Sequence, residues 1–191
     1  MCSSDLGLEL IAHADSPFDS ELRDELLALH QPSPDELRRS ALAANGIALR
    51  YARVVDELIR RAAGNGIGPG DILAIGAHGQ TVRHRPDGTP IERHTLQLLN
   101  PALLAEKTGL TVVADFRNRD LAAGGQGAPL VPAFHQATFG SSEVQTCVLN
   151  LGGIANLTVL RSHPRDTLLG FDCGPGNMLL DARSEEHTSE L

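Results

Sequence analysis

Glycine-rich segments that also carry acidic and amide side chains lie close together in the second half of the sequence. They occupy residues 124–132, 150–157 and 170–177. Because glycine has no Cβ, the backbone amides of such segments can approach a ligand closely and form a cradle for phosphate groups and sugar hydroxyls. An acidic residue in such a loop is a natural candidate for a general base. The pattern therefore indicates phosphoryl transfer to a small molecule.

Asp172 is the candidate base. It follows the apolar residues 168–171, which are predicted to end a strand, and it precedes the turn sequence 174–176. Open sheets bind ligands at the carboxyl ends of their strands, so this carboxylate could take a proton from an attacking water or hydroxyl. The alternative is that Asp172 only caps a helix that starts near Asn177.

Two arginines are candidates for stabilising the charge of the phosphoryl group. Arg117 and Arg119 follow the predicted strand 110–114, with Asp115 and Asp120 beside them. Because negative charge accumulates on the oxygens of the transferred group, one of these arginines is expected to face the site. A surface cluster of salt bridges, which would add little stability, is the alternative.

Polar residues also follow the predicted strand 71–76. His78, Gln80 and the threonine after it offer hydrogen-bond donors and acceptors suited to sugar hydroxyls. A metal site is not expected. His78, His84 and His94 lack the close spacing of metal ligands, and no cysteine or acidic partner is arranged around them.

A glycine pair, Gly152 and Gly153, is predicted to form the turn of a hairpin. Such a pair alone indicates only a tight turn, because any tight hairpin uses glycine. With Asn150 and Asn156 on either side, however, it resembles a turn that contacts phosphate.

A different chemistry, acyl transfer, would use Cys173 as nucleophile and His135 as base. No local motif supports it, and a small buried hydrophobic residue is the simpler interpretation of Cys173. Cys2, Cys147 and Cys173 show no paired spacing, so free thiols in a reducing compartment are expected rather than disulfides.

Apolar periodicity and turn residues predict the elements that position these side chains. The first helix is expected to begin at the N-cap Ser16, and the second with a capping box formed by Ser33 and Glu36. Residues 95–114 are interpreted as a β-α-β unit, and strands of both orientations imply a mixed sheet. The predicted helices are residues 16–30, 33–63, 100–109 and 129–139, and the predicted strands are residues 71–76, 95–98, 110–114, 145–151 and 155–160.

Composition limits the class of protein. The 191 residues are 41% hydrophobic and carry a formal net charge of -8, which is typical of a globular, soluble protein. The charges form no basic stripe, so a nucleic-acid partner is not expected and a small-molecule ligand fits better. No apolar run approaches the roughly 20 residues of a membrane span, and the start lacks a secretory pattern, so a cytoplasmic location is expected.

The motifs, taken in order, resemble those of bacterial anhydro-N-acetylmuramic acid kinase. The resemblance extends over residues 8–182. It implies an actin-like, hexokinase-type ATPase fold, in which two RNase H-like lobes with mixed sheets flanked by helices close around ATP and a sugar. It also divides the chain into a first lobe at 7–140 and the start of a second lobe at 141–182. Residues 183–191 are polar and carry no apolar stripe, so they are expected to be a non-native tail. The motifs are residues 78–81, 115–120, 124–135, 150–157 and 171–177.

The resemblance implies a reaction and roles for residues. ATP, water and 1,6-anhydro-N-acetylmuramic acid would give N-acetylmuramic acid 6-phosphate and ADP in cell-wall recycling. Asp172 matches the aspartate that activates water, and Arg119 matches an arginine of the sugar site. Magnesium would arrive bound to ATP. The remaining matches are sugar-pocket residues His78, Gln80, Asp115, Gly174, Gly176 and Asn177, and the second phosphate loop with Asn150, Gly152 and Gly153.

The sequence also departs from the family pattern. Asn118 stands where an arginine is common. The Gly-Thr-Ser-x-Asp-Gly phosphate loop with which the family begins does not occur, and the adenosine-binding part of the second lobe has no counterpart. Because phosphoryl transfer depends on electrostatic positioning, this polypeptide is expected to be an inactive fragment of a kinase. The resemblance also implies a possible homodimer, since the family tends to dimerise. A sugar-binding remnant without catalysis is the alternative.

Overall fold

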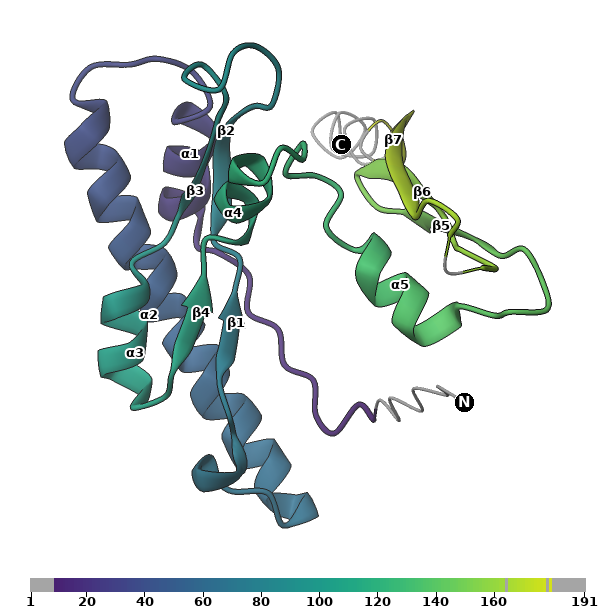
Figure 1. Ribbon diagram of the computed structural model, residues 1–191. Coiled ribbons are helices and arrows are strands. Elements are labelled where there is room, and N and C mark those ends of the chain that lie inside the picture. Colours follow the sequence, from purple (N-terminus) through teal and green to yellow (C-terminus); the bar gives the residue numbers. More distant parts are fainter. Residues whose placement is uncertain (1–8, 164, 178, 180–191) are drawn as a thin grey trace, which may run out of the picture. The chain divides into compact units, whose positions relative to one another are not determined.

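The computed structural model describes residues 9–163, 165–177 and 179, and the chain divides into two compact units (Figure 1). The N-terminal unit comprises residues 9–127, and the C-terminal unit comprises the described residues from 128 onward. The lobe boundary predicted between residues 140 and 141 falls inside the C-terminal unit and stays a prediction. The tail predicted at 183–191 lies outside the described residues.

The N-terminal unit packs helices against two small sheets. Its long helix α2 lies beside the strands (Figure 1) and contributes buried residues to two neighbouring apolar clusters. Ile47 of α2 belongs to the first cluster, and Ala48 belongs to the second with Ala77 and Leu104. The elements are α1 (Ser20–Ala28), α2 (Glu36–Ala62), η1 (Ala63–Asn65), η2 (Pro69–Asp71), β1 (Ile75–Ala77), β2 (Gln80–Arg85), β3 (His94–Leu98), α3 (Pro101–Thr108), β4 (Val112–Ala114) and α4 (Phe116–Ala122).

The strands of this unit pair differently from the prediction. β1 pairs with β4 in parallel, and β2 pairs with β3 in antiparallel orientation. The β-α-β interpretation of residues 95–114 is therefore wrong in its pairing, because the parallel partner of β4 is β1 and not β3. Both strand orientations occur in the described residues, but each sheet there contains only one of them.

The first two helices start later than predicted because other groups engage the expected caps. Asp19, not Ser16, caps α1 by accepting a hydrogen bond from the backbone amide of Leu22 at 2.9 Å. The expected capping box of α2 is not formed. Ser33 Oγ instead accepts from Arg39 at 2.7 Å, and the carboxylate of Glu36 accepts from Arg83 at 2.7 Å.

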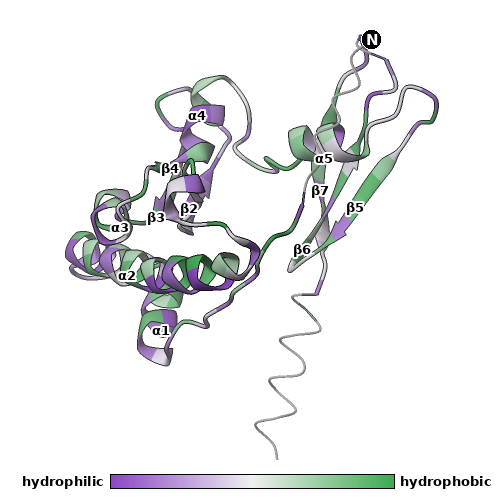
Figure 2. Cartoon of the chain, turned by 90° about the horizontal axis from the view of Figure 1, so that it is seen from below, coloured by the Kyte–Doolittle hydropathy of each residue, from purple (hydrophilic) through white to green (hydrophobic). Residues whose placement is uncertain are grey.

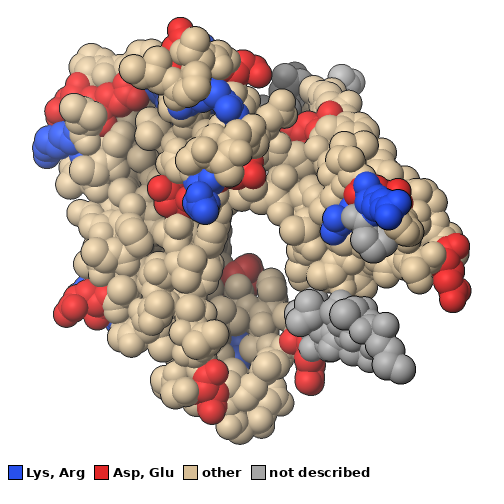
Figure 3. All heavy atoms as spheres, viewed as in Figure 1, with Lys and Arg blue, Asp and Glu red and all other residues tan. Residues whose placement is uncertain are grey.

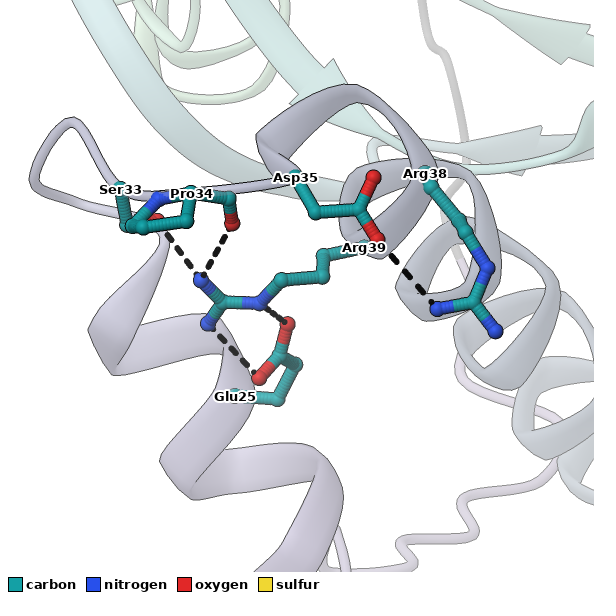
Figure 4. Close-up of polar contacts among 6 residues, drawn as sticks. All are labelled: Glu25, Ser33, Pro34, Asp35, Arg38 and Arg39. Atoms are coloured by element: carbon teal, nitrogen blue, oxygen red, sulfur yellow. Dashed lines mark hydrogen bonds and ion pairs between the residues drawn. The ribbon is translucent and has the colours of Figure 1, made fainter.

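Arg39 joins the start of α2 to α1 (Figure 4). Its Nε and Nη2 donate to the two carboxylate oxygens of Glu25 at 2.7 and 2.9 Å, while its Nη1 reaches Ser33 Oγ and the carbonyl of Pro34. Planar, two-point contacts of this kind between arginine and a carboxylate are among the stronger polar contacts in proteins. The contact fixes the connection between the two helices.

The strand predicted at 71–76 begins later, at Ile75. Pro69 starts a short 3-10 helix, and the carboxylate of Asp71 accepts a hydrogen bond from the amide of Gly68 at 2.8 Å. These local contacts hold Asp71, the first residue of the predicted strand, in the 3-10 helix. Leu73, which lies within the predicted strand, is 93% exposed.

The C-terminal unit is an antiparallel sheet with one described helix on it. The strand order is β5-β6-β7, and the hairpin predicted around the glycine pair is confirmed between β5 and β6. The imidazole of His135 on α5 is buried and bonds Thr158 Oγ1 of β6 at 2.8 Å. The elements are α5 (Pro132–Phe139), β5 (Cys147–Leu151), β6 (Ile154–Val159) and β7 (Leu169–Pro175).

The two units together contain helices and small sheets flanked by helices, so the chain is a mixed α/β protein. On the face drawn in Figure 3, acidic and basic side chains are interspersed rather than gathered into a basic stripe. Within the described ranges, no helix is both long and apolar enough to cross a membrane. The same residues contain no cluster of three or more histidine, cysteine or acidic side chains that could hold a metal ion.

Candidate functional site

The carboxyl ends of β1 and β4 bring two predicted sugar-site residues together. Because these strands are parallel, their carboxyl ends lie at one edge of the sheet, where His78 follows β1 and Asp115 follows β4. Both line a pocket of about 280 Å³. Gln80 is not among the lining residues, since it begins β2 and pairs with Leu98. The other lining residues are Thr95, Leu96, Gln97, Leu99, Pro101, Ala114 and Asn118.

Arg117 on α4 determines which nitrogen of His78 carries a proton. Its Nε donates to His78 Nε2 at 2.8 Å, so Nε2 must be the acceptor because arginine cannot accept a hydrogen bond. His78 Nδ1 lies 2.8 Å from the carbonyl oxygen of Gly79 and is therefore the nitrogen that donates. These two contacts place an imidazole proton on Nδ1 and leave Nε2 as the acceptor. Of the two arginines considered from sequence, Arg117 is the one that contacts a pocket residue.

Asn118 shapes the backbone turn after β4. Asp115 has a φ of 62°, in the left-handed region that aspartate tolerates better than most residues. Asn118 Nδ2 donates to Asp115 Oδ1 at 2.6 Å, and both residues line the pocket. Asn118 was noted in the sequence only as a departure from the family pattern, so its role in positioning Asp115 was missed.

Arg119 lies on the exposed surface of α4. Within the described ranges, its guanidinium forms no hydrogen bond or ion pair with another residue, and it does not line the pocket. The acidic residues beside the arginines are engaged by hydrogen bonds, Asp115 with Asn118 and Asp120 with the amide of Gly127. These contacts of Asp115 and Asp120 are hydrogen bonds to amide groups and not salt bridges, so they differ from the salt-bridge cluster that was the alternative from sequence.

The glycine-rich loop at 124–127 differs from the predicted phosphate cradle. The amide of Gly124 donates to the carbonyl of Leu121, that of Gly125 to the carbonyl of Asp120, and that of Gly127 to the Asp120 carboxylate. Arginine side chains bind the loop carbonyls in turn, Arg93 at Gly125 and Arg117 at Gly127. Three of its amides therefore bond within the protein. Gly125 serves close packing, since a Cβ there would lie 2.1 Å from Asp120 Oδ2.

The predicted phosphate loop and the segment after β7 form one turn structure. The amide of Gly176 donates to the carbonyl of Gly153, and the amide of Asn177 to the carbonyl of Gly152, both at 2.8 Å. Asn177 Nδ2 adds a bond to the Leu151 carbonyl at 3.1 Å. A Cβ on Gly176 would meet Gly152 O at 2.2 Å, so the approach requires glycine. Within the described part of the chain, the amides of Gly152 and Gly153 themselves donate to no backbone carbonyl, which suits a phosphate.

A polar row crosses the sheet beside this turn. The strand register places Asn156 between Asn150 and Asp172, and directly paired residues point to the same face of a sheet. Asp172 thus lies within β7 and not at the end of a strand, as the sequence had predicted, although its side chain is exposed. Asn156 Oδ1 is buried and has no hydrogen-bond partner among the described residues. Only the register reveals this alignment.

The alternative cysteine-histidine chemistry receives no geometric support. Cys173 is exposed, contrary to the expected burial, and its Sγ lies 4.0 Å from the carbonyl of Phe171. His135 is buried and bonded to Thr158. In the described residues no hydrogen bond joins the thiol to the imidazole, as a nucleophile and its base would require.

Comparison with known proteins decides the family. A family model described as "Anhydro-N-acetylmuramic acid kinase" matches residues 3–191. The chain belongs to the anhydro-N-acetylmuramic acid kinase family. Relatives that carry this name include a Bordetella pertussis protein, 57% identical over 95% of this chain, and a Variovorax paradoxus protein, 53% identical over 94% of it. A third, from Albidiferax ferrireducens, is 50% identical over 96% of the chain.

The chain spans about half the length of the curated family members that it matches. The alignments cover 46%, 48% and 51% of these three anhydro-N-acetylmuramic acid kinases. The family match includes both the pocket at the β1-β4 edge and the glycine turn with its polar row. Each part lies within its own compact unit.

Proposed function

We propose that the protein phosphorylates 1,6-anhydro-N-acetylmuramic acid with ATP and opens the anhydro ring with water, giving N-acetylmuramic acid 6-phosphate and ADP. The observation that carries this proposal is the family match over residues 3–191, which includes every motif singled out from the sequence. The reaction belongs to cell-wall recycling in the cytoplasm. The fold proposed for the whole protein is the actin-like ATPase fold, with the two compact units contributing to its two lobes.

Asp172 acts as the general base in this proposal. It takes a proton from the water whose oxygen bonds to the anomeric carbon, the bond from that carbon to the bridging oxygen breaks, and the released oxygen accepts the phosphoryl group. General bases must be accessible to the proton that they take, and the exposed position of Asp172 supports the role. Asn150 and Asn156, aligned with Asp172 across the sheet, supply amide groups on the same face.

Two sets of residues bind the sugar. The first is the pocket edge with His78 and Asp115, joined by Gln80 on the adjoining strand and by the exposed guanidinium of Arg119. His78 has a ring that both donates and accepts hydrogen bonds, which suits sugar hydroxyl groups. The second set is Gly174, Gly176 and Asn177 after Asp172.

The nucleotide phosphates bind at the hairpin turn. Gly152 and Gly153 direct backbone amides at an anion, and Asn150 adds a side-chain amide two residues before Gly152. Magnesium, bound to the phosphates of ATP, neutralises part of their charge when present. The proposed role of the protein residues here is to orient the phosphates.

The test is an assay of a full-length protein that contains this segment, using ATP and 1,6-anhydro-N-acetylmuramic acid, with product identified by mass spectrometry. Formation of a sugar 6-phosphate that carries one oxygen atom from labelled water supports the proposal. Absence of product from a folded, full-length protein contradicts it.

The 191-residue polypeptide alone is expected to give no product, because it spans about half the length of its relatives. Isothermal titration with the anhydro sugar then distinguishes a sugar-binding remnant, which would release or absorb heat, from a polypeptide that binds nothing.

A further inference from the structure

Gln97 of β3 has a carbonyl oxygen without a hydrogen-bond partner. Its Oε1 is buried, and no donor among the described residues reaches it. Burying an acceptor without a partner costs free energy, so such an atom calls for an explanation, of which a ligand is one. Gln97 lines the pocket of about 280 Å³ at the β1-β4 edge. Hydrophilic colouring marks much of β2 and α4, which both contact β3 (Figure 2).

The other end of the Gln97 amide is held by two threonines. Nε2 donates to Thr95 Oγ1 at 2.6 Å and to Thr81 Oγ1 at 3.3 Å. Thr95 is 1% exposed, and its oxygen also lies 3.4 Å from the carbonyl of Arg83 and 3.1 Å from His84 Nδ1. Because the carbonyl of Arg83 can only accept, the single hydroxyl proton of Thr95 is directed there, and its oxygen accepts from Nε2. The amide is thereby oriented, with Oε1 left as the unbonded end.

The remaining polar side chains of the pocket offer few donors to a ligand. The ring nitrogens of His78 bond Arg117 and the carbonyl of Gly79. Asp115 Oδ1 accepts from Asn118, and its Oδ2 forms no hydrogen bond within the described part of the chain. A carboxylate oxygen and the carbonyl oxygen of the glutamine are therefore the acceptors that await a partner. Such a pocket suits a ligand group that donates hydrogen bonds and disfavours an anion.

We propose that Gln97 determines specificity in the proposed sugar pocket, where its Oε1 accepts a hydrogen bond from a neutral donor of the sugar. This inference rests on the proposed function. At neutral pH, 1,6-anhydro-N-acetylmuramic acid has two such donors, the N–H of its acetamido group and its 4-hydroxyl, because the anhydro bridge and the lactyl ether occupy the other oxygens. Since Oε1 is buried, a small movement of the surrounding side chains accompanies binding, as is common at binding sites.

The charge of the pocket also sets how the sugar enters it. The lactyl carboxylate is directed away from the pocket, because the carboxylate of Asp115 would repel it. The edge that carries the acetamido group or the 4-hydroxyl enters instead. An analogue that lacks the donor leaves Oε1 without a partner, and a site built to bond a donor rejects such an analogue.

The first test replaces the amide. Gln97→Met, in a full-length protein that contains this segment, keeps a long unbranched side chain but has no carbonyl oxygen. KM for the anhydro sugar is expected to rise about tenfold to a hundredfold. KM for ATP and kcat should change little, because the bond to the sugar is made in the ground state and in the transition state alike. Gln31→Met is the matched control, since Gln31 is exposed and does not line the pocket.

Two sugar analogues identify the donor. One carries an O-acetyl group in place of the acetamido group and so lacks the N–H, and the other is the 4-deoxy sugar. The unaltered protein is expected to have a kcat/KM about tenfold or more lower for one of them. Gln97→Met is expected to lose this discrimination, and the analogue for which it is lost names the donor. A purely structural role for Gln97 would instead raise KM for all three sugars by the same factor.

Three results would overturn the inference while leaving the proposed function in place. One is a KM for the sugar that Gln97→Met leaves unchanged, and another is a variant that keeps the full discrimination between the sugars. The third is an equal kcat/KM of the unaltered protein for all three sugars, a measurement that decides the matter even where Gln97→Met does not fold. Absence of any sugar phosphate from the folded, unaltered protein contradicts the proposed function itself, and the inference with it.

Discussion

Arg117 Nε donates a hydrogen bond to His78 Nε2 at 2.8 Å, which connects α4 to the residue that follows β1. The same guanidinium also binds the carbonyl of Gly127. One side chain thus fixes both the proton position of a pocket residue and the end of the glycine-rich loop.

Replacing Arg117 should change which ring nitrogen of His78 carries the proton. In Arg117→Ala, Nε2 loses its donor, so the ring proton is expected to be shared between Nδ1 and Nε2 instead of staying on Nδ1. Long-range ¹H–¹⁵N spectra of the imidazole measure this change directly. Arg119→Ala is the control, because the Arg119 side chain forms no hydrogen bond or ion pair within the described residues. An unchanged His78 spectrum in Arg117→Ala would show that the hydrogen bond from Arg117 does not determine which nitrogen carries the proton.

Arg119→Ala should weaken sugar binding without affecting stability. The side chain is exposed, so its removal should leave the melting temperature within experimental error. The loss of a charged hydrogen-bond donor to a ligand should lower affinity for the anhydro sugar about tenfold to a hundredfold. Titration calorimetry of the full-length protein measures the affinity. Unaltered sugar affinity would remove Arg119 from the proposed sugar site.

Asp172→Asn should abolish most of the activity while preserving the fold. The substitution keeps the size of an exposed side chain but removes the base, so kcat is expected to fall about 10²- to 10⁴-fold. The KM for ATP should change little. Cys173→Ser, at the neighbouring exposed position, is the control and should retain activity. Equal losses in the two variants would point to a local structural effect instead.

Gly176→Ala should disrupt the turn that joins the end of β7 to the hairpin. The new Cβ would lie 2.2 Å from Gly152 O, and the backbone would have to move, at a cost of about 1–3 kcal/mol in the free energy of unfolding. Gly153→Ala offers a matched control, since a Cβ there meets nothing within 4 Å. Urea denaturation measures both. Similar losses in the two variants would contradict the steric explanation.

The contact between Glu25 and Arg39 should make stability depend on pH. Hydrogen bonds from Arg39 hold the pKa of the Glu25 carboxyl below its ordinary value of 4.5. Because the pKa is lower in the folded state, the stabilisation is complete well above pH 4.5 and is lost as the pH falls through the lowered pKa. Glu25→Gln should therefore lower the melting temperature at pH 7, and the difference should vanish in acid. Glu106→Gln, at an exposed carboxylate without an ion pair in the described residues, should show no such trend.

The sequence could predict those elements that depend on contacts between close neighbours. Asn100 caps α3 and Gly109 ends it, as expected, because both devices act within one turn of the helix. Ser16 and Ser33 fit the same local rule, but neither of them caps a helix. Each is bound by an arginine distant in sequence, Arg50 for Ser16 and Arg39 for Ser33, and local pattern does not reveal such partners.

The candidate site was predictable in its residue types but not in its arrangement. His78 and Asp115 were expected at strand ends, where the parallel pairing of β1 and β4 places them. The alignment of Asn156 with Asp172 depends on the register of three strands and on the irregularity in pairing after Ala155. Register is a property of the assembled sheet, so the inspection of single segments could not supply it.

The loop at 124–127 shows that glycine content does not measure flexibility. Its amides at Gly124, Gly125 and Gly127 are bonded within the protein, and two arginines bind its carbonyls. Hydrogen exchange of these amides with solvent should consequently be as slow as in the adjoining helix, although the composition is that of a linker. A protease that cleaves mobile connections would find no favoured site there, and the segment acts as a rigid end to the N-terminal unit.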